Sequence, residues 1–106
     1  MKIFKTDIKD KNEFNRIGYH YTKVYADDEN HIYVFRMKHN DKKLEMPYSE
    51  YELVKGVKVK NPDGNYVYRY PSDEEFGTSG WFYLGNDEKC WEQMNAKIQS
   101  LLEHIG

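Results

Sequence analysis

Residues 86–105 carry the clearest hydrophobic periodicity of the chain. Apolar side chains recur every three or four positions through "NDEKCWEQMNAKIQSLLEHI", which is typical of one face of an α-helix. The members of this stripe are Trp91, Met94, Ile98, Leu101, Leu102 and Ile105. Asn86 or Asp87 can cap the first turn. The negative charges of Asp87 and Glu88 also stabilise the positive N-terminal end of the helix dipole. The pattern predicts a C-terminal amphipathic helix that must cover an apolar surface.

The stretch "GYHYTKVYADDENHIYVFRMKH" predicts an antiparallel hairpin, because two β-rich runs flank the polar turn Asp27 to Asn30. We expect Ala26 to face His31. One face, expected to be core, then holds His20, Thr22, Val24, Tyr33, Phe35 and Met37, and the other holds Tyr19, Tyr21, Lys23, Tyr25, Ile32, Val34, Arg36 and Lys38. A register change of one residue would regroup both faces.

The stretch "GVKVKNPDGNYVYRY" predicts a second hairpin, with Pro62 and Gly64 in its turn. A three-residue loop pairs Lys60 with Tyr66 and Lys58 with Tyr68. Val57, Val59 and Val67 are then expected on the core side, and Lys58, Lys60, Tyr66, Tyr68 and Tyr70 on the other side.

The remaining segments carry weaker patterns. "MKIFK" predicts a short edge strand, and "DKNEFNRIG" predicts a helical turn capped by Asp10. Ser49 and Glu52 have the spacing of a capping box before Gly56, which predicts a short helix, although the tyrosines and Val54 favour a strand. "GWFYLG" predicts a short strand over Trp81 to Leu84.

These elements predict one domain over residues 1–106 with an α+β fold. We expect an antiparallel sheet of two hairpins plus a short strand, with the C-terminal amphipathic helix packed on one face. In the stretch "YPSDEEFGTSGWFYLGND", Pro71 ends the second hairpin. We expect Phe76, Trp81 and one of Phe82 or Tyr83 to fill the core under the helix.

Composition narrows the function classes. The formal net charge of −2 argues against a general electrostatic grip on nucleic acid. The single cysteine, Cys90, excludes an internal disulfide and predicts a small buried hydrophobe. Neither a leader pattern nor a long apolar run occurs, so we expect a cytoplasmic protein without a membrane partner.

The motifs of common catalytic sites are weak or missing. Ser79 in "GTSGW" lacks the last glycine of a nucleophile elbow. The four histidines lack helical metal-pair spacing, and the acid runs 27–29 and 73–75 are typical of solvated turns. Neither a phosphate loop nor a dinucleotide fingerprint is present. We therefore predict no enzyme activity, no metal site and no cofactor.

Tyrosines beside cations are the best candidate for a working surface. The chain has 16% aromatic residues and ten tyrosines, a residue type enriched in binding surfaces. The predicted partner-binding residues are Lys58, Lys60, Tyr66, Tyr68, Tyr70, Tyr19, Tyr21 and Arg36. Such faces are typical of a protein-binding surface, of a platform for single-stranded nucleic acid, or of an ordinary solvated sheet face. The sequence indicates no oligomeric state.

The pattern Pro71-Ser72-x-Glu74-x-Phe76-Gly77-x-x-x-Trp81-x-Tyr83 before a helix resembles a family of short uncharacterised proteins of Bacteroidota genomes, phages and plasmids. The resemblance covers about a quarter of the chain, from Tyr70 to Ile98. It implies a mobile-element origin, and small phage proteins often bind and block a host protein, including CRISPR-type defence nucleases. We therefore expect a small non-enzymatic protein-binding module that inhibits a host defence protein by occluding it. The alternative is a single-stranded nucleic-acid-binding domain that uses a Tyr/Lys sheet face.

Overall fold

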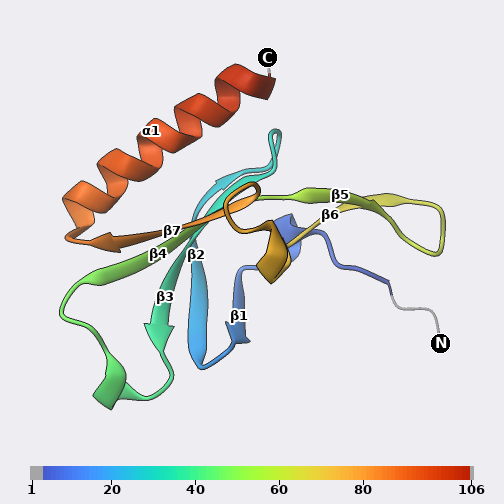
Figure 1. The fold of residues 1–106 in the computed structure, drawn as a ribbon. Coiled ribbons are helices and arrows are strands. Elements are labelled where there is room, and N and C mark those ends of the chain that lie inside the picture. The colour runs from blue at the N-terminus through green and yellow to red at the C-terminus, as the bar shows by residue number, and fades with distance from the viewer. Residues whose placement is uncertain (1–3, 106) are drawn as a thin grey trace.

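The computed structural model describes residues 4–105 and has the α+β architecture expected from the sequence (Figure 1). A five-stranded antiparallel sheet has the order β1-β2-β3-β4-β7, and β5 and β6 form a separate two-stranded sheet. The strands are β1 (Glu13–Arg16), β2 (Tyr19–Asp27), β3 (Ile32–His39), β4 (Ser49–Lys55), β5 (Val57–Lys60), β6 (Tyr66–Arg69) and β7 (Gly80–Gly85). The helices are α1 (Asp87–Ile105) and the short 3-10 turns η1 (Ile8–Asp10), η2 (Lys42–Leu44) and η3 (Asp73–Glu75).

Helix α1 packs across one face of the five-stranded sheet, which we call the helix-covered face (Figure 1). Cys90, Met94 and Ile98 are buried against strands β3 and β4. The cluster beneath the helix also contains Ile32, Val34, Tyr51, Leu53, Trp81, Tyr83, Trp91, Leu101 and Leu102. The predicted apolar stripe is therefore confirmed from Trp91 to Leu102, and the side chain of Ile105 lies outside the described part of the chain.

The predicted register of the first hairpin is wrong. The loop lies one residue later than expected, so that Asp27 pairs with Ile32 and Ala26 with Tyr33. That shift alone preserves the two faces, but a β-bulge at Val24 inserts one extra residue and inverts them along the rest of β2. Tyr21 consequently lies on the same face as Phe35 and Met37. It is buried, whereas Val24 is exposed.

Two predicted helical segments are strands. Residues 13–16 form β1, which turns through Ile17 and Gly18 into β2, and Asp7 rather than Asp10 caps the neighbouring turn η1. The capping box at Ser49 does not form, because β4 is paired on both sides and its β-favouring residues are buried. In the predicted strand "MKIFK", residues 1–3 lie outside the described chain, and Phe4 and Lys5 are not in a strand.

The second hairpin, β5 and β6, has the predicted register and a positive φ at Gly64, and it projects away from the main sheet (Figure 1). We call it the arm. Its predicted core side is wrong, because Tyr68 and Tyr70, and not the valines, pack on the core cluster of the main sheet. The chain enters the arm at Gly56, where an added Cβ would lie 2.7 Å from Tyr68 Cβ. Only glycine permits this close approach.

The sheet face opposite α1 is covered in part by short, separate pieces of chain. Ile8 from η1, Tyr68 and Tyr70 from the arm, and Phe76 pack on a cluster formed by Tyr21, Tyr33, Phe35, Met37 and Val54. The expectation that Phe76 lies under the helix is therefore wrong, whereas Trp81 and Tyr83 do pack against the helix cluster. Within residues 4–105, no such piece covers the half of this face nearer the β1–β2 turn.

Candidate functional site

The arm does not present its three tyrosines together. Tyr66 is 60% exposed, with Lys58 Nζ 4.8 Å from the centre of its ring. Tyr68 stacks on His31, with 3.4 Å between ring centres, and Tyr70 packs edge-on against Phe14. Lys58 and Lys60 are exposed. The arm therefore offers one free aromatic ring beside two cations.

The other three predicted site residues lie on different faces. Tyr19 and Tyr21 belong to the face opposite α1, where their cross-strand partners on β3 are His39 and Met37. Arg36 points to the helix-covered face. Tyr19 is half-buried and Tyr21 is buried, so neither forms a shared exposed patch with Arg36.

The uncovered half of the opposite face holds an apolar groove of about 380 Å³. Its residues come from the β1–β2 turn, from the middle strands, from η3 and from β7. They are Arg16, Ile17, Tyr19, Tyr21, Met37, Glu50, Asp73, Phe82 and Leu84. Ile17 is 75% exposed, and Phe82 and Leu84 are 54% and 55% exposed. Three of the most exposed large apolar side chains of the described chain thus border one cavity.

The backbone of Ile17 is in a conformation that branched residues rarely adopt. Its φ is +48° and that of Gly18 is +79°, so both residues of this two-residue turn are left-handed. Such turns strongly favour asparagine or aspartate before the glycine, and a β-branched residue there is strained. The turn therefore holds an exposed isoleucine at the mouth of the groove at a cost in stability, which is a common property of functional sites.

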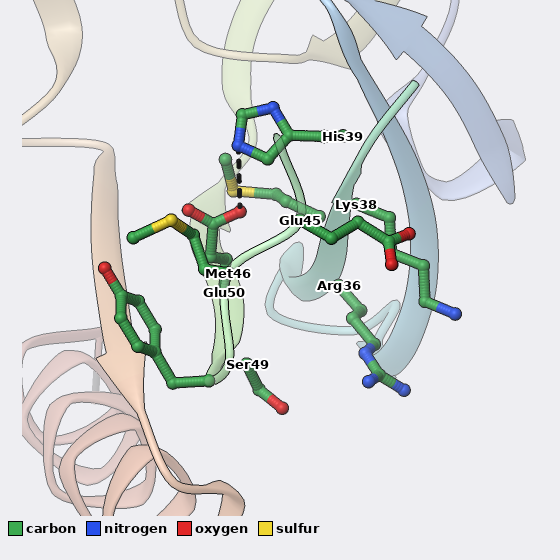
Figure 2. Close-up of a pocket in the computed structure, with 9 residues that line it drawn as sticks. Arg36, Lys38, His39, Glu45, Met46, Ser49 and Glu50 are labelled. Atoms are coloured by element: carbon green, nitrogen blue, oxygen red, sulfur yellow. Dashed lines mark ion pairs between the residues drawn. The ribbon is translucent and has the colours of Figure 1, made fainter. Parts of the chain in front are cut away.

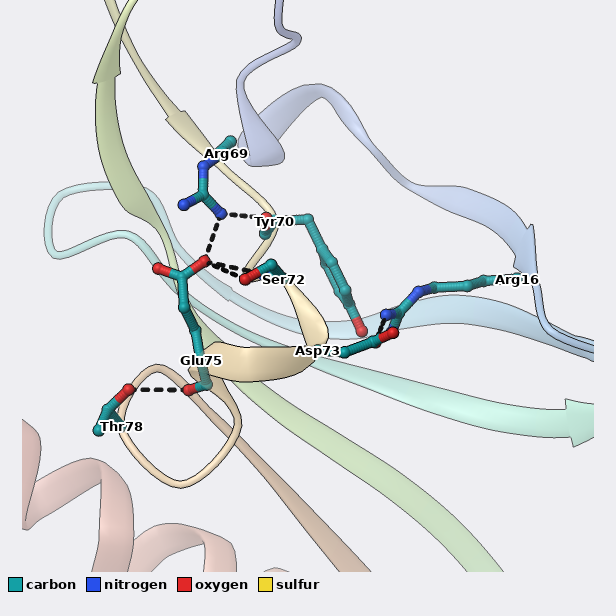
Figure 3. Close-up of polar contacts among 7 residues, drawn as sticks. All are labelled: Arg16, Arg69, Tyr70, Ser72, Asp73, Glu75 and Thr78. Carbon is teal, nitrogen blue, oxygen red and sulfur yellow. Dashed lines mark hydrogen bonds and ion pairs between the residues drawn. The ribbon is translucent and has the colours of Figure 1, made fainter.

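Segment 71–79, which we call the latch, contributes Asp73 to the lining of the groove. Figure 3 shows the polar contacts that hold this segment. Asp73 forms an ion pair with Arg16 of β1, and the Arg16 guanidinium lies 5.2 Å from the centre of the Tyr70 ring. Arg69 Nη1 lies 2.6 Å from Glu75 Oε1, which also accepts hydrogen bonds from Ser72. The hydrogen bond from Arg69 is the main cause that lowers the pKa of Glu75 to about 2. These acids therefore fix the latch in place.

Glu52 is a buried acid next to the groove. It lies on the same face as Glu50, and its cross-strand partner on β7 is the groove residue Phe82. Its side chain is fully buried, and neither carboxylate oxygen has a hydrogen-bond partner within residues 4–105. Burial raises the pKa of Glu52 to about 7, a rise opposed by the positive charge of Arg16 and by the Tyr21 hydroxyl.

Two further hollows lie at the end of the sheet near η2 and are polar. Figure 2 shows the first, of about 150 Å³, where His39 Nε2 lies 4.0 Å from Glu50 Oε2. Its labelled lining residues are Arg36, Lys38, His39, Glu45, Met46, Ser49 and Glu50. The second, of about 340 Å³, adds Asn86 and Asp87 at the start of α1. Asp87 there accepts hydrogen bonds from the Ser49 and Tyr51 hydroxyls, so it connects the helix to β4.

Several of the groups considered for catalysis or metal binding make structural contacts instead. Within residues 4–105, no group of three or more His, Cys, Asp or Glu side chains is placed to hold a metal ion. Asp27 accepts hydrogen bonds from Asn30, and Asp28 accepts one from the Tyr33 hydroxyl. Cys90 is buried under the helix, and burial raises the pKa of its thiol. In the same part of the chain, no helix is both long and apolar enough to cross a bilayer.

No protein-family model, curated protein or solved structure matches this chain.

Of the nine groove residues, the predicted site included only Tyr19 and Tyr21, and it missed the exposed apolar ones, Ile17, Phe82 and Leu84. The run from Trp81 to Leu84 is apolar on both sides of its strand, which is typical of a strand buried on both faces. The structure buries only the Trp81 and Tyr83 side. The usable signal was Ile17 before Gly18, because an apolar residue is unusual in a tight turn.

Proposed function

We propose that this chain is a non-enzymatic protein-binding module that docks its partner in the apolar groove on the open half of the sheet. The observation that carries the proposal is the convergence of Ile17, Phe82 and Leu84 on one cavity of about 380 Å³. Apolar surface gathered in a hollow with a polar rim is typical of protein interfaces, whereas single exposed apolar residues are ordinary.

The rim of the groove supports specific recognition. Arg16 and Asp73 form an ion pair on one side, and Glu50 lies beside His39 on the other. Charged groups at a rim orient a partner and exclude wrong ones, while the apolar centre provides most of the binding energy. The groove thereby replaces the arm tyrosines as the leading surface, and Tyr19 and Tyr21 are the members of the predicted site that remain part of it.

The mode of action that fits such a module is occlusion of a surface on the partner. The resemblance of the latch sequence to mobile-element proteins supports a narrower form of the proposal, in which the partner is a host defence protein that the chain inhibits. A partner docked in the groove covers Phe82 and Leu84, the two exposed apolar side chains of β7 that border it.

Site-specific photo-crosslinking in cells tests the groove. A photoreactive phenylalanine analogue at position 82 is compared with the same analogue at position 44, since Leu44 is similarly exposed but lies on η2 outside the groove. We expect an adduct with another protein from position 82 and none from position 44, and we expect Ile17→Asp to abolish the adduct. Adducts that survive Ile17→Asp, or that form equally from both positions, would contradict a groove-based interface.

The arm supports the alternative function, single-stranded nucleic-acid binding, through Tyr66 beside Lys58 and Lys60. Oligonucleotide binding that weakens steeply with salt and is lost in Tyr66→Ala would favour it. Because the arm lies outside the groove, Ile17→Asp should leave any such binding intact. The two variants therefore separate the two functions.

A further inference from the structure

Strand β7 forms an open edge of the five-stranded sheet. The Lys55 N–H donates to Ser79 O, and antiparallel pairing alternates, so Trp81, Tyr83 and Gly85 are bonded to β4. The backbone groups of Phe82 and Leu84 therefore point outward, away from the sheet. The Gly80 carbonyl at the start of the strand is already used, because it accepts from the Gly77 N–H.

This edge lacks the features by which proteins usually prevent strand pairing. The segment Gly80–Gly85 contains neither a charged residue nor a proline. The side chains beside the free backbone groups, Phe82 and Leu84, are more than half exposed. An exposed, apolar and uncharged edge strand is a template for another strand.

We propose that β7 pairs antiparallel with β7 of a second copy of this chain, forming a two-fold symmetric dimer with one continuous sheet of five strands from each copy. With Tyr83 on the two-fold axis, Phe82 of each copy faces Leu84 of the other. Four new hydrogen bonds then use all the outward backbone groups of both residues in both copies. The free part of the edge is therefore complementary to itself.

Side chains on the helix-covered face fit the same register. Trp81 of one copy faces Gly85 of the other, so a large ring lies opposite a residue without a side chain. Lys97 Nζ lies 4.3 Å from the centre of the Trp81 ring, and Asp87 and Glu88 follow Gly85 in the first turn of α1. The pairing thus brings the cation of each copy beside the acidic helix start of the other, and this charge complementarity favours a second copy over an unrelated strand.

The proposed dimer does not depend on the proposed function. The two proposals share only the residues of β7 that line the groove. Phe82 and Leu84 line the groove of each copy, so pairing joins the two grooves into one apolar trough across the two-fold axis. The interface is small, and we expect weak association that is concentration-dependent at micromolar levels or above. Self-association of the purified chain and capture of another protein in cells are separate measurements, so either proposal can fail alone.

Sedimentation equilibrium over a range from micromolar to millimolar protein tests the pairing. We expect the average mass to rise from 12.8 kDa towards twice that value. Leu84→Pro removes one outward N–H without breaking a bond to β4, so it should raise the dissociation constant at least about tenfold. Phe82→Lys should do the same, whereas Leu44→Lys, which changes an exposed leucine elsewhere, should match the unmodified chain. Circular dichroism confirms that each variant is folded.

Disulfide trapping in a Cys90→Ala background tests the register. Tyr83→Cys places two thiols at a non-hydrogen-bonded pair on the axis, with Cα atoms close enough for a disulfide. Phe82→Cys is the matched control, because position 82 faces position 84 of the other copy. We expect a covalent dimer from position 83 and little from position 82. A chain that stays at single-copy mass at every concentration, or Leu84→Pro dimerising as well as the unmodified chain, would overturn the proposal.

Discussion

The two faces of the main sheet are covered in different ways. The helix-covered face is closed by one continuous element, α1, which buries Cys90, Met94 and Ile98 together. The opposite face is covered by a turn, the base of the arm and the latch, and these pieces stop short of the groove. One face therefore supplies stability, while the other combines stability with an open, strained and partly apolar surface.

The contrast between the two faces indicates where this small protein can carry a binding site. The whole apolar stripe of an amphipathic helix has to be buried against the sheet. The sheet face beneath the helix is therefore closed along the length of that stripe. Short separate pieces can each cover a few side chains and leave the next ones free. These short pieces also leave the carboxyl group of Glu52 fully buried on the opposite face.

The largest expected effect is the loss of a side chain under the helix. Met94→Ala should lower the free energy of unfolding by about 3 kcal/mol, because Met94 is fully buried and the cavity cannot collapse freely. Leu84→Ala on the open face should cost less than about 0.5 kcal/mol. Urea unfolding at low protein concentration measures both. Equal losses at the two positions would remove the proposed contrast between the faces.

Glu52→Gln sharpens the contrast through pH. The pKa of Glu52 is raised to about 7 in the folded chain from 4.5, so the folded state binds the proton more tightly than the unfolded state does. Stability contributed by the neutral acid is therefore present below pH 4.5 and is lost as pH rises through 7. Relative to the unmodified chain, Glu52→Gln should gain up to roughly 3 kcal/mol at about pH 8 and nothing near pH 4.

Chemical unfolding of both chains across this pH range tests the effect. Glu74→Gln, which removes an exposed acid of the latch, controls for the loss of one negative charge. A pH-independent difference between Glu52→Gln and the unmodified chain would contradict a neutral buried acid.

Gly56→Ala should disturb the opposite face alone. The new methyl group would lie 2.7 Å from Tyr68 Cβ and 3.3 Å from Ile8 Cγ2, so the base of the arm must move, at a cost of about 2 kcal/mol. Hydrogen exchange should then quicken in β5 and β6 more than in α1. Lys58→Ala, an exposed change on the same hairpin, should leave both regions as they are.

The smallest expected effect is a gain in stability. Ile17→Asn places the residue type preferred for this turn before Gly18, so it should stabilise the chain by about 0.5 kcal/mol. The same change removes an apolar side chain from the groove and should weaken the crosslink from position 82. Thermal unfolding and crosslink yield are measured on the same preparation. A less stable variant would contradict the strain assigned to Ile17, and a variant that crosslinks normally would mean that Ile17 has no role in binding.

Regular local patterns predicted much of the fold. The helix stripe from Trp91 to Leu102, the register of the arm and the strand around Trp81 each depend on residues close in sequence. The bulge at Val24 could not be predicted in this way, because one unpaired residue leaves the alternation of β2 intact on both sides of it. That single residue exchanged the two faces of β2 from Tyr19 to Lys23.

The candidate site was harder to predict than the fold. Ile17, Met37 and Leu84 are far apart in the chain. They meet only because β7 pairs with β4, although the arm and the latch separate these two strands in the sequence. The arm tyrosines were expected on a solvent face, yet Tyr68 and Tyr70 pack on the main sheet, because the Gly56 junction brings the arm against His31 and Ile8. Alternation along a hairpin defines two sides, but tertiary contacts decide which side is buried.

The strand order also governs how the chain folds as it leaves the ribosome. Strands β1 to β4 pair with consecutive neighbours, so this meander can close through local hairpins once Lys55 has emerged. One edge of β4 then stays unpaired until the ribosome has synthesised the arm, the latch and β7, which pairs with it. During that interval Leu53, which the finished protein buries completely, lies on an unpaired edge. The nascent chain is thus most prone to aggregate just before its final quarter is synthesised.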